Sequence, residues 1–157
     1  MIARADGRID FLDAMQVEGE DYGFGAFMAS VEALLIGRRT YDTALTFDEW
    51  PFASKRVWVA THRQLDGRFG EVGIAGDVSS MLEELANCGV RHVYLDGGEL
   101  IRQALLVGAV DEMTLSVVPM ILGSGRRLFD GTLPALKWQL LSSASFASGL
   151  AQLRYRS

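Results

Sequence analysis

Two adjacent arginines and a threonine follow directly after an apolar run in this chain of 157 residues. Residues 33–42 read ALLIGRRTYD, so the change from apolar to cationic takes a single residue, Gly37. Arg38, Arg39 and Thr40 supply positive charge and a hydroxyl, which are groups that bind phosphate, and a glycine lets the backbone approach such a ligand. The segment therefore predicts an anion-binding turn. The structural alternative is a solvated arginine followed by a threonine that caps a helix.

Two further apolar runs end in residues of the same kind. The run VWVA is followed by Thr61, His62 and Arg63, and the run VYLD is followed by Gly97 and Gly98. In open α/β sheets, ligands bind beyond the carboxyl ends of the strands, where helix N-termini present unpaired N–H groups. The three strand ends are therefore expected to lie at one ligand-binding edge.

The elements that must position these residues follow from apolar periodicity. Phe24, Phe27, Met28 and Val31 recur at helical spacing, which predicts an amphipathic helix over about residues 21–32. Similar arguments predict the remaining elements: strands at 33–37, 56–61, 90–98 and 112–122, helices at 77–89 and 99–108, and a terminal hairpin at 136–157 turning near 148–149. We expect a single α/β domain over residues 1–157, with three layers, a mainly parallel sheet and an antiparallel C-terminal edge hairpin.

Composition excludes several classes of function. Lys and Arg number 15 against 20 Asp and Glu, so a general nucleic-acid binder is not expected, although an arginine pair could bind one small polyanion. One cysteine and two histidines provide neither an internal disulfide nor a metal cage. The N-terminus lacks a signal-peptide core, and no apolar run approaches the ~18 residues of a membrane span. We expect a cytoplasmic protein with a small-molecule substrate and no metal, membrane or nucleic-acid partner.

Several motifs together resemble a known fold family. ADGRI, GRRTYD, VWVATHR, DGGELIRQAL, VDEMTLSVVPMILGSGRRLF and the terminal LRY occur in the order found in the dihydrofolate reductase-like fold. The chain resembles in particular the reductase domain of the bacterial bifunctional riboflavin-biosynthesis deaminase-reductase and its stand-alone relatives. The resemblance covers essentially the whole chain, and the long run that begins at DGGEL makes it specific, whereas GRRT or GG alone would not.

The resemblance implies an NADPH-dependent reductase. The GRRT turn would hold the phosphates of NADPH, the segment after the second strand would lie by the adenosine 2′-phosphate, and the double-glycine turn would receive the pyrophosphate. Arg38 and Arg63 would distinguish NADPH from NADH, because only NADPH carries a 2′-phosphate. The cofactor-binding residues implied are Ile9, Gly37, Arg38, Arg39, Thr40, Thr61, His62, Arg63, Gly97, Gly98, Glu99, Leu100 and Ile101.

The resemblance also implies catalytic and substrate-binding residues. The loop that contains Asp6 would flank the nicotinamide and the substrate, and Asp21 is the positional match for the carboxylate that protonates a pterin. Phe24 and Trp50 could line a pocket for a planar substrate. The structural alternatives are a turn residue at Asp6, an acid that complements a helix N-terminus at Asp21, and plain core aromatics. The Arg126 and Arg127 pair is interpreted as a surface or subunit contact rather than a substrate-phosphate clamp.

Departures from the family bear on the substrate. Arg4 stands where the family usually has serine, and ALTFDEWPF replaces an Asp-Asp-Pro segment that helps to hold a ribose phosphate. The favoured function is that of a reductase resembling 5-amino-6-(5-phosphoribosylamino)uracil reductase of riboflavin biosynthesis. Two alternatives are a dihydrofolate or pterin reductase and a non-catalytic NADP-binding regulatory protein. Dimers are usual in the family, and the apolar residues 115–122 support a homodimer.

Overall fold

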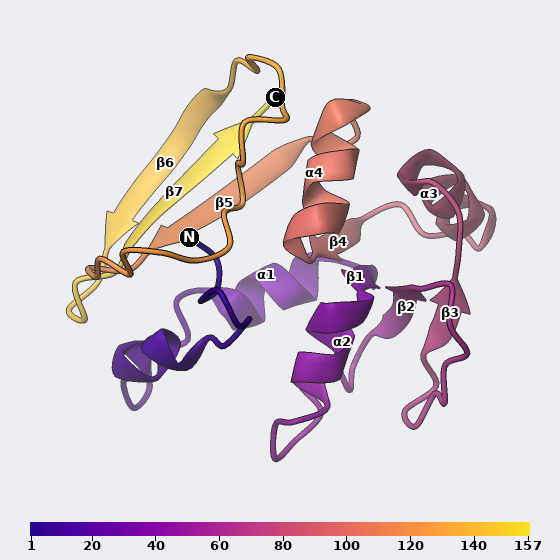
Figure 1. Ribbon diagram of the computed structural model, residues 1–157, viewed down its shortest axis with the longest axis horizontal. Helices are drawn as coiled ribbons and strands as arrows, with labels where there is room; N and C mark the ends of the chain where they lie inside the picture. Colours follow the sequence, from indigo (N-terminus) through magenta and orange to yellow (C-terminus); the bar gives the residue numbers. More distant parts are fainter. The chain divides into compact units, whose positions relative to one another are not determined.

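The computed structural model describes residues 1–157, and the chain divides into two compact units (Figure 1). One unit is formed by two stretches that are separate in the sequence, Met1–Gly23 and Gly108–Ser157. The second unit is the continuous stretch Phe24–Val107. One domain over the whole chain stays a prediction.

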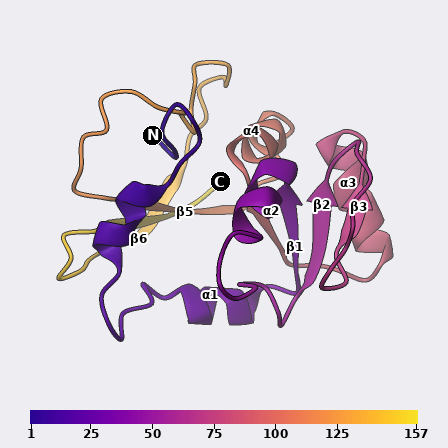
Figure 2. The ribbon, with the colours of Figure 1, turned by 60° about the horizontal axis from the view of Figure 1, so that its bottom comes forward.

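The continuous unit contains a parallel sheet with helices between its strands. Its elements are α1 (Phe24–Ser30), β1 (Ala33–Gly37), α2 (Arg38–Ala44), β2 (Arg56–Ala60), β3 (Val72–Ile74), α3 (Val78–Asn87), β4 (Val93–Asp96) and α4 (Gly98–Leu106). The four strands pair in the order β3-β2-β1-β4, and every pair is parallel. Figure 2 shows β1, β2 and β3 side by side. Strand β1 is therefore central, with a parallel neighbour on each side.

Strand β1 is buried on both faces, as its unbroken apolar run predicts. Leu34, Leu35 and Ile36 have no solvent-exposed surface. Leu34 and Ile36 belong to the hydrophobic core on one face, together with Met28 of α1 and Tyr41 of α2. Parallel strands covered on both faces read as continuous apolar runs, so the sequence and the burial agree.

Helix α3 begins at an acidic N-cap and is followed by a glycine, as its sequence predicts. The Asp77 carboxylate accepts a hydrogen bond from the Ser80 backbone N–H at 2.9 Å and so caps the helix. Val78, Met81 and Leu85 form the buried stripe. The chain leaves the helix through Gly89, whose φ of +79° is left-handed.

The other unit is built on an antiparallel sheet. Its elements are the 3-10 helix η1 (Asp10–Met15) and the strands β5 (Glu112–Val117), β6 (Gln139–Ser145) and β7 (Ala151–Arg156). The strands pair in the order β5-β7-β6. The predicted hairpin is confirmed, and its turn contains Gly149 with a φ of +82°. The chain is thus a mixed α/β protein, with the antiparallel strands in a sheet of their own.

Several boundaries differ from those that periodicity predicts. Strand β5 ends at Val117 rather than at residue 122, because Pro119 has no N–H for a sheet hydrogen bond. Helix α1 is shorter than predicted, and the side chains of Phe24 and Phe27 are exposed while that of Met28 is buried. Helix α2, strand β3 and the 3-10 helix η1 were not predicted.

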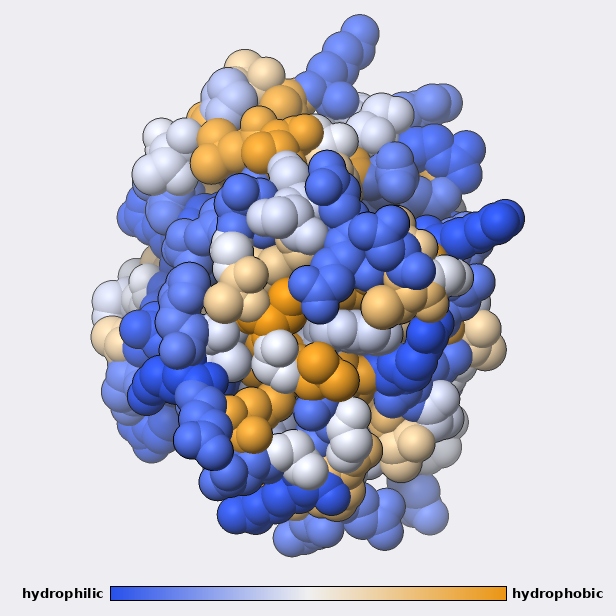
Figure 3. Space-filling view, turned by 90° about the vertical axis from the view of Figure 1, so that its right-hand side faces the viewer, coloured by the Kyte–Doolittle hydropathy of each residue, from blue (hydrophilic) through white to orange (hydrophobic).

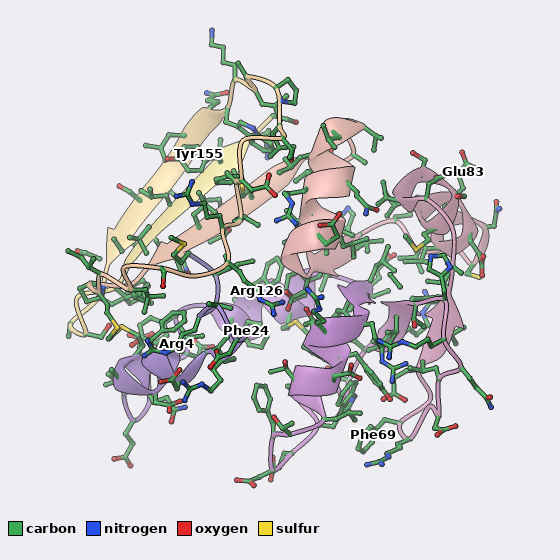
Figure 4. The ribbon with its side chains drawn as sticks, viewed as in Figure 1. Arg4, Phe24, Phe69, Glu83, Arg126 and Tyr155 are labelled. Atoms are coloured by element: carbon green, nitrogen blue, oxygen red, sulfur yellow. The ribbon has the colours of Figure 1, made fainter.

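The surface mixes polar and apolar side chains. Figure 3 shows one face of the molecule, on which hydrophilic side chains surround small separate hydrophobic patches. Phe69, on the loop that precedes β3, is the most exposed aromatic side chain of the continuous unit, at 57% (Figure 4). None of the helices has the length and the apolar character that a membrane span requires.

Candidate functional site

The parallel sheet brings the three predicted strand ends to one edge. Gly37, the last residue of β1, is in register with Ala60 of β2, and Ile36 is in register with Asp96 of β4. The residues that follow these strands therefore begin at the same edge. Thr61 comes directly after β2, and Gly97 comes directly after β4. The prediction that the three strand ends share one edge of the sheet is confirmed.

The turns after β1 and β4 approach each other closely. A Cβ built on Gly97 would lie 3.2 Å from the backbone nitrogen of Gly37 and 3.2 Å from Oγ1 of Thr40. Gly97 also has a φ of +112°, a conformation that side-chain-bearing residues rarely adopt. A Cβ on Gly37 would instead make only ordinary contacts, 3.8 Å from the Asp96 carbonyl oxygen. Gly97 is therefore the glycine on which the junction depends.

Helix α4 starts immediately after this junction. Gly97 occupies its N-cap position, and no side chain caps the helix there. Leu100 is buried, while Ile101 donates its backbone N–H to the Gly97 carbonyl oxygen at 2.9 Å. The Glu99 carboxylate forms an ion pair with Arg102 and accepts a hydrogen bond from the Gln103 amide at 3.1 Å. The backbone N–H groups of the first turn are the kind of donors that bind an anion.

The segment after β1 is helical rather than a loop. Gly37 is the N-cap of α2, so Arg38, Arg39 and Thr40 form the first turn of that helix. Thr40 is therefore not the capping residue that the structural alternative assumes. A helix places the side chains of residues one apart in different directions, so the adjacent arginines do not project together.

Arg38 connects α2 with the loop that follows β2. Its Nε donates to Asp42 Oδ1 at 2.8 Å, and its Nη1 donates to the Gln64 carbonyl oxygen at 3.3 Å. Its Cζ lies 5.8 Å from the centre of the Tyr41 ring. Arg39 is exposed. Arg38 is thus held over the loop that contains the predicted 2′-phosphate residues.

That loop is anchored at its first residue. The Thr61 N–H donates to the Ile74 carbonyl oxygen at 2.8 Å, which ties the end of β2 to β3. The Thr61 hydroxyl accepts the Arg63 backbone N–H at 3.1 Å, so the side chain closes a small turn. His62 and Arg63 are exposed. The loop therefore presents both predicted residues to solvent from a fixed start.

Sequence reasoning did not single out Asp96, the last residue of β4. Its carboxylate is half-buried, and Oδ2 accepts a hydrogen bond from the Tyr94 hydroxyl at 3.3 Å. Burial raises the pKa of Asp96 above its usual range, against the opposing effects of the Gly97 N–H and the Tyr94 hydroxyl. The Tyr94 ring packs edge-on against Phe27, with ring centres 4.9 Å apart. The available signal was an acid directly before two glycines at a strand end.

Asp6 lies in the other unit and is held in its ionised form. Its Oδ1 accepts the Arg8 backbone N–H at 3.0 Å, and its Oδ2 accepts Nε of Arg8 at 2.7 Å. These hydrogen bonds lower the pKa of Asp6 below its usual range. At neutral pH the carboxylate can accept hydrogen bonds and orient a ligand. Ile9, three residues further on, stands at the N-cap of η1.

Asp21 belongs to the same unit as Asp6. Its Oδ1 accepts the Gly23 backbone N–H at 2.8 Å, in the turn that precedes α1. Both predicted catalytic acids therefore accept backbone hydrogen bonds within local turns.

The two predicted substrate-binding aromatics have different surroundings. Phe24 begins α1 and is 43% exposed. Trp50 stacks on Phe69, with ring centres 4.9 Å apart and an interplanar angle of 9°. The Trp50 ring also meets Tyr41 and Phe52 edge-on, at 5.9 Å and 5.2 Å between ring centres. Trp50 is thus part of an aromatic cluster beside the core.

The structure gathers the cofactor-binding residues of the continuous unit at one edge and leaves Asp6, Ile9 and Asp21 in the other unit. It nowhere brings three His, Cys, Asp or Glu side chains into an arrangement that could hold a metal ion. The lone cysteine, Cys88, is exposed.

A parallel sheet with glycine turns at its carboxyl edge, combined with an antiparallel sheet, defines the class: an α/β protein of the dihydrofolate reductase-like fold. The chain belongs to the family described as "RibD C-terminal domain", whose model matches residues 40–152. This is a family of reductase domains of riboflavin biosynthesis. The chain therefore belongs to a family of oxidoreductases.

Individual relatives agree with this family. A crystal structure from Shewanella sp. PV-4, named "Putative riboflavin biosynthesis protein", is 30% identical, has a TM-score of 0.89 and is matched over 99% of this chain and 90% of its own. YwjB, an uncharacterized protein of Bacillus subtilis, is 29% identical over 99% of this chain and 90% of its own length. A Thermotoga maritima deaminase/5-amino-6-(5-phosphoribosylamino)uracil reductase shares the fold at a TM-score of 0.72, with 14% identity and 52% of its chain covered.

Proposed function

We propose that this protein is an NADPH-dependent reductase that reduces a C=N or C=O bond in a pyrimidine- or pterin-like small molecule. Membership of the RibD C-terminal domain family supports a reductase. The name of the Thermotoga maritima relative includes 5-amino-6-(5-phosphoribosylamino)uracil reductase, which supports a substrate of that general class. The proposed reaction resembles the one in that name.

The observation that carries the proposal is the junction of Gly37, Thr40 and Gly97. A Cβ at Gly97 would press on the Gly37 nitrogen and on Thr40 Oγ1, so the glycine is what lets the two turns pack against each other. The junction combines the uncapped N-terminus of α4 with the Thr40 hydroxyl. Such an arrangement suits the pyrophosphate of a dinucleotide, which a helix N-terminus and hydroxyl donors stabilise. These residues fit NADPH.

Selection of NADPH is assigned to two arginines. Arg38 reaches the Gln64 carbonyl oxygen, in the same loop as Arg63. Both guanidinium groups can therefore serve a 2′-phosphate held at that loop, and a bidentate guanidinium contact suits a phosphate dianion. His62 and Thr61 complete the proposed 2′-phosphate side. Arg39, Gly98, Glu99, Leu100 and Ile101 remain in the proposal as residues that line or support the phosphate turns.

Bound NADPH supplies the hydride, and the residues of this chain orient the reactants and handle the proton. Asp6, ionised by its contacts with Arg8, would accept hydrogen bonds from the substrate, and Asp21 or a water would supply the proton. Ile9 would contact the nicotinamide, and Phe24 and Trp50 would contact a planar substrate.

A panel of pyrimidine and pterin substrates, tested with NADPH, examines the reaction directly. Loss of absorbance at the nicotinamide band with at least one of them is the expected result. The same panel with NADH serves as the control for cofactor choice. NADPH binding without turnover on any substrate would favour the alternative of a non-catalytic NADP-binding protein. Turnover on a dihydropterin but on no aminopyrimidine would favour the dihydrofolate or pterin reductase alternative.

We also propose that the protein acts in the cytoplasm as a homodimer. The homodimer is supported by the apolar composition of residues 115–122, within which Val117, Met120 and Ile121 have exposed side chains. Ile121 is 96% exposed, an unusual state for a large apolar side chain. Light scattering at micromolar concentration should give the mass of two chains, and a monomer mass would contradict the dimer.

A further inference from the structure

We propose that Arg126 forms a binding site for an oxyanion group, a carboxylate or a phosphate, on the ligand that this protein takes besides its cofactor. The site lies within the unit formed by Met1–Gly23 and Gly108–Ser157. In assigning the oxyanion to the substrate, the proposal rests on the reductase function. The ability of Arg126 to bind an oxyanion does not depend on that function.

The backbone of Arg126 is fixed by a reciprocal pair of hydrogen bonds. Its N–H donates to the Ala3 carbonyl oxygen at 2.8 Å, and its carbonyl oxygen accepts the Ile2 N–H at 2.8 Å. The preceding residue must be glycine for this bridge to form, because a Cβ at Gly125 would lie 2.4 Å from the Ala3 carbonyl oxygen. The GSG sequence thus serves to place an arginine against the N-terminal segment.

The guanidinium of Arg126 packs on the turn that contains Gly7. That turn is closed by the Arg4 N–H to the Arg8 carbonyl oxygen at 2.9 Å and by the Gly7 N–H to the Arg4 carbonyl oxygen at 3.0 Å. Gly7 has a φ of +95°. A Cβ built on it would lie 3.4 Å from Nη2 and 3.5 Å from Cζ of Arg126. A Cβ at these distances would make ordinary van der Waals contact with the guanidinium, so it is the left-handed φ of Gly7 that requires a glycine in this turn.

The acids of this turn are already occupied by other arginines. Asp10 accepts Nε of Arg4 at 2.6 Å, and Asp6 accepts Nε of Arg8 at 2.7 Å. Both contacts lower the pKa of the carboxylate concerned, so both acids are charged and paired at neutral pH. The side chain of Arg126 makes no hydrogen bond or ion pair, although it is half-buried. The structure therefore leaves one half-buried cation without a counter-charge beside two satisfied pairs.

This arrangement suits an oxyanion of a ligand. A guanidinium presents its N–H donors in a planar fork that matches the two oxygens of a carboxylate or two oxygens of a phosphate. A half-buried cation gains more from such a partner than an exposed one, because water screens it less. Arg126 is therefore assigned to ligand recognition rather than to a subunit contact.

The experiment follows the guanidinium of Arg126 itself. The full-length protein, labelled with ¹⁵N and free of cofactor, is titrated with inorganic phosphate and separately with acetate at constant ionic strength, and the arginine Nε–H signals are recorded. Absence of one signal in Arg126→Gln identifies the Arg126 resonance. We expect the shift of that resonance to reach saturation with at least one of the two anions. The anion that binds more tightly shows whether the ligand group is a phosphate or a carboxylate.

Two matched variants distinguish specific binding at Arg126 from a general attraction of anions to nearby positive charge. Arg127→Gln removes the same charge from the next residue and should leave the Arg126 shift saturable with an unchanged dissociation constant. Arg126→Lys keeps the charge but loses the fork, and chemical shifts of the Gly7 amide should show binding weakened about tenfold, the value for one charge-assisted hydrogen bond. A shift that never saturates with either anion, or one lost equally in Arg127→Gln, would overturn the proposal.

Failure of this proposal can be told apart from failure of the reductase function. NADPH affinity should be unchanged in Arg126→Gln, since the oxyanion is assigned to the other ligand. Loss of NADPH affinity in that variant would overturn the assignment to the substrate. If the parent protein bound no NADPH, the reductase proposal would fall while a saturable phosphate or acetate shift at Arg126 would still stand.

Discussion

The backbone nitrogen of Gly37 lies 3.2 Å from the point at which a side chain on Gly97 would begin. Gly37 ends strand β1, and Gly97 directly follows β4, the adjacent parallel strand. Their closeness turns two separate loops into one surface at the carboxyl edge of the sheet. The proposed cofactor site depends on this contact more than on any single charged residue.

Gly97→Ala should therefore lose both stability and NADPH binding. The φ of +112° imposes strain of about 1–3 kcal/mol on a residue with a Cβ, and the new atom would press on Gly37 and Thr40. Thermal unfolding and calorimetric titration would measure the two effects. Gly89→Ala is the matched control, because Gly89 has a φ of +79° but nothing within 4 Å of a new Cβ. It should lose stability and keep NADPH binding. Equal NADPH affinity in Gly97→Ala and the parent protein would contradict the site.

Substitutions in the first turn of α2 should rank by the charge they remove. Arg38→Ala should weaken NADPH binding by about 1.5–3 kcal/mol, because a charge-assisted contact is lost, and Thr40→Val by about 0.5–1.5 kcal/mol, because a neutral hydroxyl is lost. The stability of ligand-free Arg38→Ala should fall only by the ~0.3–0.5 kcal/mol typical of an i,i+4 pair, here with Asp42. An unchanged dissociation constant in Arg38→Ala would return Arg38 to a purely structural role.

The half-buried carboxylate of Asp96 predicts a pH dependence of stability. Its pKa is raised in the folded protein, so the folded state holds the proton more tightly than the unfolded state does. The contribution of Asp96 to the free energy of unfolding should therefore fall as pH rises from the unfolded pKa of about 3.9 through the folded pKa, by about 1.4 kcal/mol for each unit between the two. Asp96→Asn should be more stable than the parent protein at neutral pH, and the difference should vanish in acid.

Urea unfolding of both proteins across the acid range would measure this difference. Tyr94→Phe is the control, because it removes the hydroxyl that donates to Asp96 but keeps the titrating carboxylate. The contribution of Asp96 to the pH dependence should persist in Tyr94→Phe and disappear in Asp96→Asn. A parent protein that gained stability with pH over this range as steeply as Asp96→Asn would contradict the raised pKa.

The two predicted catalytic acids can be tested by isosteric amides. Asp6→Asn and Asp21→Asn should each lose turnover, roughly a hundredfold for the loss of a positioned proton-handling group, while keeping NADPH affinity. Steady-state kinetics on a substrate found in the panel, with calorimetry for NADPH, would measure both. Asp10→Asn is a control that disturbs the Arg4 pair in the same region. Full turnover in both variants would remove carboxylate catalysis from the proposed mechanism.

Local signals in the sequence predicted much of the fold. The unbroken run of β1, the Asp77 cap of α3 and the glycine turn of the terminal hairpin each have a physical cause within a few residues, so each could be predicted. Helix α2 could not, because its N-cap is Gly37, which offers no capping side chain, and its first turn reads as a charged loop. Strand β3 has three residues, one of them glycine, which is too short for a pattern.

The candidate site was predictable in part for the same reason. Glycine and arginine after buried strands indicated where a phosphate could bind, because parallel strands share an edge. The partners of those residues come from elsewhere in the chain and could not be predicted: Arg38 reaches residue 64, and burial beside Tyr94 changes the acidity of Asp96. The sequence predicted that Gly37 lets its turn approach a phosphate, whereas in the structure the glycine with close contacts is Gly97. Arg126 is a similar case. That it lacks a counter-charge is known only from the structure, in which Asp10 pairs with Arg4 and Asp6 pairs with Arg8.

Calorimetric titration of the parent protein with NADPH and with NADH tests the central claim most directly. Arg38 and Arg63 beside one loop predict that NADPH binds more tightly by about ten- to a hundredfold, the value of a charge-assisted contact with the 2′-phosphate. High salt should reduce the difference, because the contact is partly exposed and ionic. Equal affinity for the two cofactors, or no binding of NADPH, would contradict the account.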